Sequence, residues 1–373
     1  MSCTRPLDHF PKMDFSFGED ADIVRQTAHE FVRRDLLPQE PKFLNSKDPA
    51  ERAQIAKAAT GSLKEMGLYS AGVPEPFGGG GLGPIETCLI ANELGQTIIP
   101  VEWGEPTPIL YECSDAQRPK YLAPVVEGSK TYAVAFDEPQ PVTDPAKMAT
   151  TATQSAGGYV LNGAKLLARP NADFYLVFAS ATGPIGPLGP ICLIIDSGAQ
   201  GAEVARSRLR LDNCAAPAEQ VLGAPGKALS LGRRWFPLTR IIRAAAVLGT
   251  CDRLLEISAQ YAHDWTSMGT HISERSSIQQ ALGDMAGDIE ALRWLVYHTA
   301  WLAAEGKKAD YDSMLVKLQA RKVLTESVNR SVRIHGGTIP PICEWLRKNA
   351  ASADANDGLR FAVARETISR LQP

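Results

Sequence analysis

The sequence lacks several features that would define a class of protein. It has no apolar run of the roughly 18 residues that a membrane helix needs, and Met1–Phe10 lacks the apolar core of a secretion signal. Its seven cysteines include no CxxC pair, so neither a disulfide framework nor a zinc site is indicated. The net charge of −3 argues against nucleic acid as a partner, because phosphate-binding surfaces carry a basic excess. We therefore expect a protein of the reducing cytoplasm.

What the sequence does contain is enough apolar material for more than one core. It has 373 residues, of which 44% are hydrophobic and 22% are charged. This length and composition favour a folded chain of two or three domains. The pattern of apolar residues changes twice along the chain, and we expect domains at residues 1–127, 128–225 and 226–373.

The first region is predicted to be helical. Apolar residues three and four positions apart run over Asp20–Val32, Arg52–Met66 and Pro84–Leu94. Between the last two lies the glycine run Gly78–Gly81. We interpret it as a loop, because a phosphate loop would need a preceding strand and a following Gly-Lys-Ser or Gly-Lys-Thr.

The middle region reads as short strands. Strand-length apolar runs occur at Thr131–Phe136, Phe174–Ala179 and Ile191–Ile195. A further strand from Gly157 is expected to run into an Asn162-Gly163 turn, since both of these residues tolerate positive φ. Pro184–Pro190 is expected to form a loop tip. Strands at this spacing predict a compact β-sandwich or barrel.

The last region returns to helix. Long periodic segments at Arg240–Tyr261, Ser277–Ala304 and Tyr311–Ile334 are followed by a fourth candidate, Ala350–Leu371. Long helices joined by short loops predict a four-helix bundle, a fold that often pairs with copies of itself. The order of helical, β and helical regions narrows the choice of fold.

Short motifs follow one another in a fixed order along the whole chain. Those that matter most are Met66-Gly67-Leu68, Val73–Gly79, Tyr121–Pro124, Tyr159–Lys165, Pro217-Ala218-Glu219, Leu282–Met285 and His335-Gly336-Gly337. Together they resemble the acyl-CoA dehydrogenase family. The resemblance implies an α+β fold with an N-terminal helical domain, a central β-barrel-like domain and a C-terminal four-helix bundle. It also implies FAD, an acyl-CoA ester that loses hydrogens from Cα and Cβ, and electron-transfer flavoprotein or a similar acceptor.

Two stretches that the resemblance places against the flavin ring depart from the family pattern. In the first, Asp137 replaces a threonine, and its carboxylate accepts hydrogen bonds but cannot donate them to a reduced, anionic flavin. Thr143 keeps a hydroxyl in that stretch and is a candidate cofactor-binding residue. In the second, the usual Trp-Ile-Thr reads Leu167-Ala168-Arg169. We interpret Arg169 as an ion-pair partner, with Asp137 as the candidate acid, rather than as a phosphate ligand.

A third stretch, which the resemblance places against the cofactor of a neighbouring subunit, also differs. Trp265–Gly269 lacks the arginine that is usual there, so Arg275 or Arg333 is the candidate cation. His335-Gly336-Gly337 is retained as a candidate cofactor-binding turn, because its glycines allow close approach of the backbone.

The chemistry implied by the resemblance needs a carboxylate as general base against Cα. At one family position the sequence reads Asp357-Gly358-Leu359 in place of Glu-Gly-Thr, with a shortened spacing to Arg365, and at the other it has Thr239. Asp357 and Glu344 are the candidate bases that remain. Arg240 matches a substrate-binding arginine of the family. Glu138 is interpreted as a residue that holds a loop.

The stretch from Trp345 to Arg360 resembles a subgroup found in heteromeric enzymes that act on steroid side chains or other bulky CoA esters. In these α2β2 assemblies one subunit keeps the chemistry, and its homologous sister has a decayed pocket. Our first hypothesis is therefore a non-catalytic or auxiliary subunit, with FAD held mainly by the partner. Two alternatives stay open: a complete FAD enzyme with an unorthodox base, and a CoA-ester-binding scaffold without redox chemistry.

Overall fold

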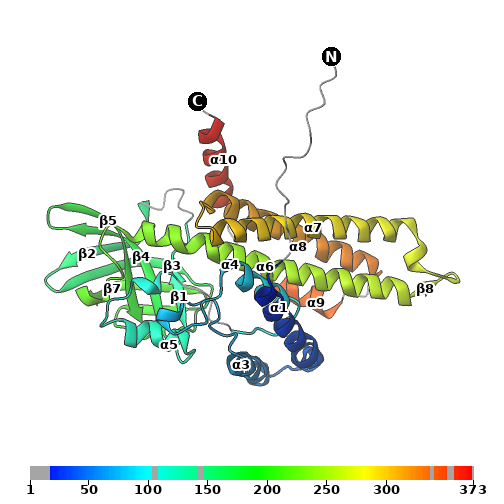
Figure 1. Ribbon diagram of the computed structural model, residues 1–373. Coiled ribbons are helices and arrows are strands. Elements are labelled where there is room, and N and C mark those ends of the chain that lie inside the picture. Colours follow the sequence, from blue (N-terminus) through cyan, green and yellow to red (C-terminus); the bar gives the residue numbers. More distant parts are fainter. Residues whose placement is uncertain (1–16, 103–107, 141–146, 337–339, 351–356, 372–373) are drawn as a thin grey trace, which may run out of the picture.

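Three regions of different structure follow one another along the chain. A computed structural model describes residues 17–102, 108–140, 147–336, 340–350 and 357–371. Helices of the first region lie beside a strongly curled sheet, and long helices of the last region run from the sheet to the far end of the molecule (Figure 1). The predicted fold, helical, then β, then helical, is confirmed.

In its described part, the N-terminal region contains the three predicted α-helices and two shorter ones. Their bounds are α1 (Glu19–Phe31), α2 (Glu40–Asn45), α3 (Pro49–Glu65), α4 (Pro84–Leu94) and α5 (Ala123–Val126). The Asp48 carboxylate starts α3 by accepting the Ala50 N–H at 2.8 Å, which satisfies a backbone donor that the helix itself leaves free. Helix α4 has the predicted bounds.

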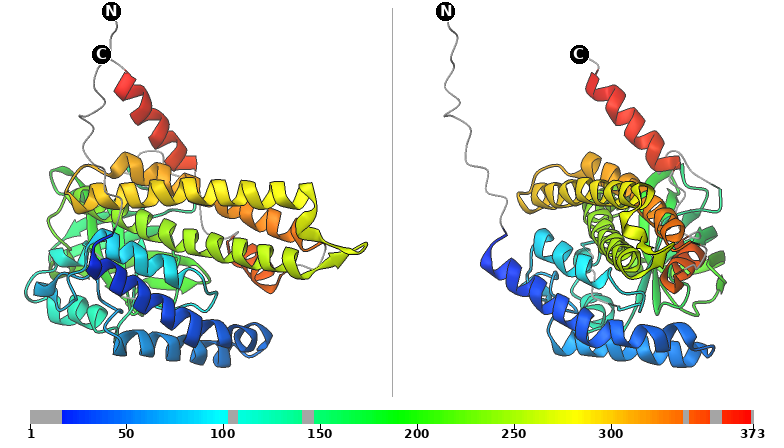
Figure 2. Two further views of the ribbon diagram at one scale, coloured as in Figure 1. Left: turned by 45° about the vertical axis from the view of Figure 1, so that its right-hand side comes forward. Right: turned by 90° about the vertical axis from the view of Figure 1, so that its right-hand side faces the viewer.

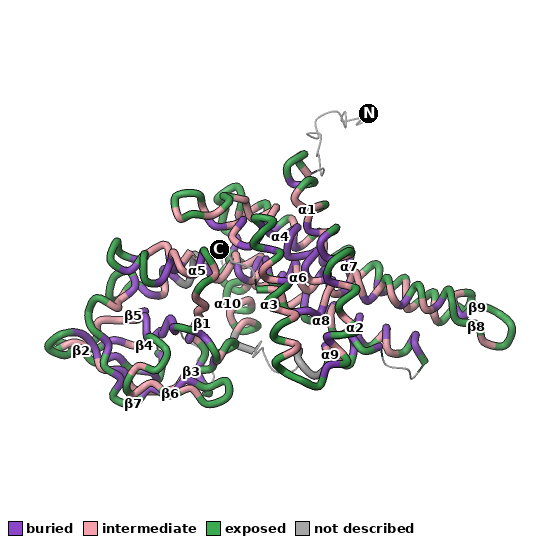
Figure 3. Tube along the Cα trace, turned by 90° about the horizontal axis from the view of Figure 1, so that it is seen from below, coloured by how far each residue is buried: buried purple, intermediate pink, exposed green. Residues whose placement is uncertain are grey.

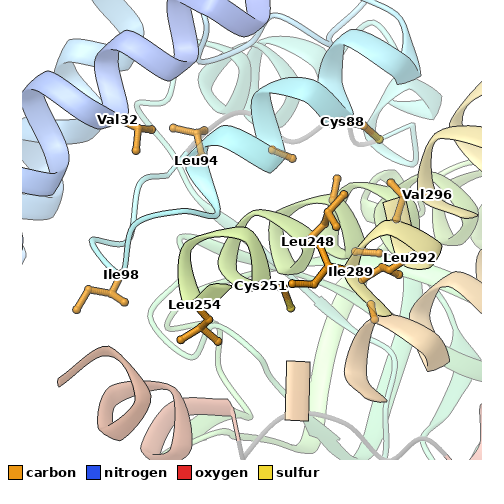
Figure 4. Packing of buried hydrophobic residues seen from close by; sticks show 14 of the residues in the cluster. Val32, Cys88, Leu94, Ile98, Leu248, Cys251, Leu254, Ile289, Leu292 and Val296 are labelled. Carbon is orange, nitrogen blue, oxygen red and sulfur yellow. The ribbon is translucent and has the colours of Figure 1, made fainter. Parts of the chain in front are cut away.

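Helix α4 is buried on nearly all sides and packs directly on the first long helix of the C-terminal region, α6 (Ala228–Asp264). A Cβ atom at Gly249 would overlap the Asn92 carbonyl, and one at Gly95 would overlap the Ala246 carbonyl. The two backbones can approach this closely only because neither glycine carries a side chain. Figure 4 shows the apolar core around this crossing, with Cys88, Leu248 and Leu292 among its members.

The middle region forms one seven-stranded sheet in the order β1-β4-β2-β3-β7-β6, with β5 on the other edge of β4. The bounds are β1 (Tyr132–Ala135), β2 (Thr151–Ser155), β3 (Gly158–Leu166), β4 (Phe174–Gly183), β5 (Gly186–Asp196), β6 (Ala202–Ala205) and β7 (Arg208–Pro217). β1 and β2 lie end to end along one edge of β4, where Ala135 pairs with Val177 and Thr151 with Ser180. The chain therefore leaves the sheet after β1 and rejoins the same edge at β2.

Strand β4 is buried on both faces. Phe174, Leu176 and Phe178 belong to the core between the sheet and the helices. Tyr175 and Val177 belong to the core inside the curled sheet. Because alternate side chains point to opposite faces, a strand buried on both faces reads as a continuous apolar run, as it does here.

One turn prediction in the middle region was wrong, and another covered too many residues. Asn162-Gly163 lies within β3 at a shift in register with β7, where Gly163 has φ 142°. A side chain at Gly163 would crowd Thr150, so the glycine serves a bulge, and the β2–β3 turn lies instead at Ala156-Gly157. The β4–β5 turn lies at Pro184-Ile185, inside the predicted loop tip, but Gly186–Pro190 belong to β5. On the other edge of β5 the described residues form one isolated bridge, Leu193 to Val221, so the prolines near the start of β5 interrupt no strand pairing there.

The C-terminal region consists of long helices and a small hairpin. Its elements after α6 are β8 (Thr266–Ser267), β9 (Thr270–His271), α7 (Ser276–Ala304), α8 (Asp310–Ile334), α9 (Pro341–Ala350) and α10 (Asp357–Leu371). The three long predicted helices are confirmed, although α6 starts earlier. The predicted helix Ala350–Leu371 is confirmed over Asp357–Leu371 as α10, and residues 351–356 at its start lie outside the described residues.

Two peripheral features of this region stand out. Helix α10 projects from the side of the other helices (Figure 2), and the β8–β9 hairpin forms an exposed tip where α6 turns into α7 (Figure 3). Within the described residues, no helix combines the length and apolarity needed to cross a membrane.

Candidate functional site

The first candidate flavin stretch begins where the chain leaves β1. The Asp137 side chain is exposed, and its backbone carbonyl accepts the Leu166 N–H at 2.8 Å. Nothing in this geometry turns the carboxylate into a hydrogen-bond donor for a ring. Thr143, the other candidate in this stretch, lies outside the described residues.

The second candidate stretch follows β3 directly. Leu167 is buried in the core of the sheet, and its N–H donates to the Ser207 carbonyl at 2.8 Å. Arg169 is an ion-pair partner, as predicted, but the acid is not Asp137. Its Nη2 lies 3.4 Å from Oε1 of Glu102, and the two side chains are 43% and 47% exposed. Glu102 was not predicted from the sequence, because the pair joins the N-terminal region to the sheet across 67 positions of the chain.

Behind these stretches lies a buried ion pair. Lys165 Nζ, at the end of β3, lies 2.9 Å from Oε1 of Glu138, and the two side chains are 0% and 3% exposed. The Glu138 carboxylate also accepts the N–H groups of Ala149 and Thr150 at 2.8 and 2.9 Å. The prediction that Glu138 holds a loop is confirmed. Burial raises the pKa of Glu138, but the hydrogen bonds from Lys165, Thr150 and Ala149 prevail and lower it to about 2.

The candidate substrate arginine lies on α6. The Arg240 guanidinium lies 5.4 Å from the centre of the Phe236 ring, and Nη1 donates to Ser313 Oγ of α8 at 3.4 Å. Burial lowers the pKa of Arg240, and the nearby Asp310 carboxylate opposes that shift. The site therefore presents a largely desolvated cation beside an aromatic wall, which suits a polar or anionic group of a ligand.

The candidate bases are not drawn together around this arginine. Thr239 is buried beside it and carries no carboxylate. Glu344 is exposed on α9, next to Cys343, whose Sγ lies 3.6 Å from Ser331 Oγ. Ser331 and the Arg240 partner Ser313 are 18 residues apart on α8, which is about 27 Å of helix.

The position of the other candidate base is set by α10. The Tyr311 hydroxyl is 3.0 Å from Thr367 Oγ1, so α10 packs on the same end of α8 that holds the Arg240 partner. Asp357 starts α10, and its side chain lies outside the described part of the chain.

The candidates for a neighbouring subunit's cofactor gather at the far end of α6 and α8. His335 Nδ1 lies 2.7 Å from the Ser331 carbonyl, and its ring stacks on Tyr261, which in turn stacks on Trp265. Gly336 has φ 61°, a backbone conformation that favours glycine. Gly337 lies outside the described residues.

The two candidate cations also belong to this end of the molecule. Arg275 donates from Nη2 to the Ser267 carbonyl of the hairpin at 3.2 Å, and both it and Arg333 on α8 are exposed. Stacked rings, exposed cations and a glycine turn therefore share one end of α6 and α8, far from Arg240, although the His335 ring itself is buried.

The chain matches two models that describe one family. The first, "Acyl-CoA dehydrogenase, N-terminal domain", matches residues 18–129, and the second, "Acyl-CoA dehydrogenase, C-terminal domain", matches residues 229–338. Together they cover more than half of the chain. The protein belongs to the acyl-CoA dehydrogenase family, whose members are FAD-dependent oxidoreductases that act on CH–CH bonds.

Relatives extend the similarity over nearly the whole chain. Acryloyl-CoA reductase (NADH) of Anaerotignum propionicum is 26% identical and covers 97% of this chain and 98% of its own. Subunit CarC of the caffeyl-CoA reductase–Etf complex of Acetobacterium woodii is 25% identical over 86% of this chain and 89% of its own. The solved butyryl-CoA dehydrogenase of Megasphaera elsdenii has the same fold, with a TM-score of 0.80 at 24% identity over 95% and 100% of the two chains.

The residues described here do not fit an isoalloxazine ring in the way that the family pattern implies. An exposed carboxylate stands where a hydroxyl donor is expected, at Asp137. Leu167 is buried in the sheet core in place of an indole cover, and the Arg169 guanidinium is paired with Glu102. At these three positions the described residues therefore offer an isoalloxazine ring neither a hydroxyl donor nor an indole cover.

Proposed function

We propose that this chain is the auxiliary, non-catalytic subunit of a heterotetrameric α2β2 acyl-CoA dehydrogenase. A homologous subunit would supply the catalytic base and hold most of the FAD, which accepts the hydride when bound. The substrate class is a steroid side chain or another bulky acyl group carried as a CoA ester. Electrons would leave to electron-transfer flavoprotein or a similar acceptor. We place the assembly in the cytoplasm, where the buried cysteines of this chain stay free thiols.

One observation carries this proposal. Arg169, at the position of the family's flavin-binding threonine, is 3.4 Å from Glu102 of the N-terminal region. A hydroxyl that would donate to the ring is thereby replaced by a cation whose partner is a protein carboxylate. Asp137 adds a second departure from the pattern, since an exposed acid repels a ring that becomes anionic on reduction.

The features that the chain retains suit an auxiliary role. The exposed side chains of Trp265 and Arg275 lie at the far end of the long helices, where buried His335 supports Tyr261 and through it Trp265, and they are available to brace the cofactor of a partner. Arg240 keeps a desolvated cation beside Phe236. We therefore expect this chain to complete the interface while the partner performs proton abstraction.

The visible absorption of the purified protein tests the proposal. The chain alone should be colourless. When it is co-expressed with a homologous subunit that carries the family's glutamate base, the assembly should be yellow with one FAD per pair of chains. An Asp137→Thr/Arg169→Thr variant restores two hydroxyls and should raise FAD retention by the lone chain, whereas the matched surface variant Arg210→Thr/Asp212→Thr should not.

Two other outcomes point elsewhere. A lone chain that is fully yellow and bleaches when an acyl-CoA is added would make it a complete enzyme, with Asp357 or Glu344 as the base to test next. A colourless lone chain that binds CoA esters and never associates with a homologous subunit would make it a scaffold protein.

A further inference from the structure

Both limbs of the segment that leaves the sheet between β1 and β2 meet at one buried ammonium group. Lys165 Nζ lies 3.0 Å from the Phe136 carbonyl and 2.9 Å from Glu138 Oε1, both on the outgoing limb. It also lies 3.6 Å from Met148 Sδ, on the returning limb. Glu138 in turn takes the N–H groups of Ala149 and Thr150. We call Glu138 and Lys165 the clamp.

The clamp makes its contacts within the protein. A lysine has three N–H donors, and Lys165 has three acceptors in reach: the Phe136 carbonyl, the Glu138 carboxylate and the Met148 sulfur. Its side chain is 0% exposed. The clamp therefore has no donor left for a ligand, and it acts on a site only by placing other residues.

The residue that the clamp places most directly is Phe136. Its carbonyl accepts a hydrogen bond from Lys165 Nζ. Its ring packs edge-on against two other rings, with 5.1 Å between the ring centres for Phe178 of β4 and 5.0 Å for Phe236 of α6. Phe236 also contacts the candidate substrate arginine: the Arg240 guanidinium lies over the Phe236 ring, 5.4 Å from its centre. A continuous series of contacts thus runs from the clamp through Phe136 and Phe236 to Arg240.

We infer that Glu138 and Lys165 are positioning residues that fix Phe136 and, through Phe236, set the orientation of Arg240 toward its ligand. An apolar pair of the same volume would serve stability as well as a buried ion pair does. Directed hydrogen bonds have a different use, because they fix both limbs of the segment to a single point. The inference rests on the proposed function only for the class of ligand at Arg240, a CoA ester.

The test replaces the clamp by apolar side chains in the full-length chain. The variant Glu138→Leu/Lys165→Met leaves no unpaired buried charge, and Arg210→Met/Asp212→Leu is the matched control, because that pair is exposed on the same sheet. Binding of octanoyl-CoA, followed by calorimetry, should weaken about tenfold in the clamp variant, as it should on loss of Arg240 itself, and by less than twofold in the control. Equal affinity in a folded clamp variant would overturn the inference.

A double-mutant cycle separates positioning from general destabilisation. In an Arg240→Met background, the clamp substitutions should cause no further loss of octanoyl-CoA affinity, because the residue they orient is already gone. Additive losses would show that the clamp acts independently of Arg240, and the inference would fail.

The inference can also be decided if the unaltered chain binds no octanoyl-CoA, a result that would count against the proposed ligand and not against the clamp. The readout is then near-UV circular dichroism, to which Trp235 contributes from its place 4.8 Å from Phe236. The aromatic signal should fall by at least half in the clamp variant at an unchanged far-UV signal. A signal equal to that of the unaltered chain would overturn the inference.

Discussion

Two cations lie four positions apart at the end of β3, and they differ in almost every respect. Lys165 is 0% exposed and lies 2.9 Å from Glu138, whereas Arg169 is 43% exposed and lies 3.4 Å from Glu102. The first holds a segment of its own sheet, and the second reaches the N-terminal region. The buried side of this strand end thus keeps a hydrogen-bonded ion pair. Its exposed side, where the family's flavin-binding residues are expected, carries a surface ion pair.

This difference explains how a pocket can decay inside an intact fold. Removing one partner of a buried ion pair leaves an uncompensated charge and typically costs about 3–5 kcal/mol. Exposed pairs contribute roughly 0.2–1 kcal/mol. Substitutions on the exposed side are therefore tolerated by the fold, and substitutions at the clamp are not. A chain under no demand to bind flavin would change first on this exposed side.

The largest effect is expected from the single substitution Lys165→Met. It leaves the Glu138 carboxylate buried with two N–H donors and no cation, so the free energy of unfolding should fall by about 3–5 kcal/mol in urea titrations. The double variant Glu138→Leu/Lys165→Met should recover most of that loss. A loss below about 1 kcal/mol would mean that the clamp contributes no more to stability than the exposed Glu102–Arg169 pair, and would contradict the difference drawn between them.

The next effect is a loss of stability at low pH. The pKa of Glu138 is lowered from 4.5 to about 2, so the folded state binds this proton more weakly than the unfolded state does. Its contribution to stability is complete above pH 4.5 and is lost as the pH falls toward 2, on the order of 3 kcal/mol in total. Urea unfolding at a series of pH values should show this loss in the unaltered chain and lack it in Glu138→Leu/Lys165→Met. Parallel curves for the two proteins would contradict the assignment.

Features that depend on residues close together in the sequence could be predicted, and features that depend on contacts between distant residues could not. Periodicity is local, so Pro84–Leu94 and the three long C-terminal helices were predicted from the sequence. Asn162-Gly163 misled because a residue pair that favours a turn also suits a bulge, and only the crowding of Gly163 against Thr150 separates the two. The Glu102–Arg169 pair depends on packing between two regions, and no local pattern marks it.

The candidate site divides in the same way. Lys165 lies in a motif that carried the family resemblance, yet its role appears only once β3 is folded beside the limbs of the 136–150 segment. Arg240 was found by resemblance, and its burial and its Phe236 contact fit a ligand site. Glu344 was a candidate base and Arg240 a candidate substrate-binding residue, but the two lie near opposite ends of α8.

A smaller free-energy change is expected from a substitution at Arg240, the residue that we propose the buried pair on β3 orients toward the ligand. Arg240→Met should weaken octanoyl-CoA binding about tenfold, which is about 1.4 kcal/mol, because it removes a desolvated cation from the proposed site. The control is Arg243→Met, one turn further along the exposed face of α6. Calorimetry with both variants measures the difference. Equal affinities would detach Arg240 from ligand binding and leave the clamp with a structural role alone.

The smallest effect is expected on the exposed side of the strand end. In a double-mutant cycle of Glu102→Gln and Arg169→Thr, the coupling free energy should lie between about 0.2 and 1 kcal/mol and shrink in 1 M salt. The exposed pair Arg210–Asp212 supplies a reference cycle with the same chemistry. A coupling of about 2 kcal/mol or more would mean that this pair holds the N-terminal region to the sheet. In that case Arg169 would have a structural reason to replace a flavin-binding threonine, and its presence would no longer speak for a pocket released from cofactor binding.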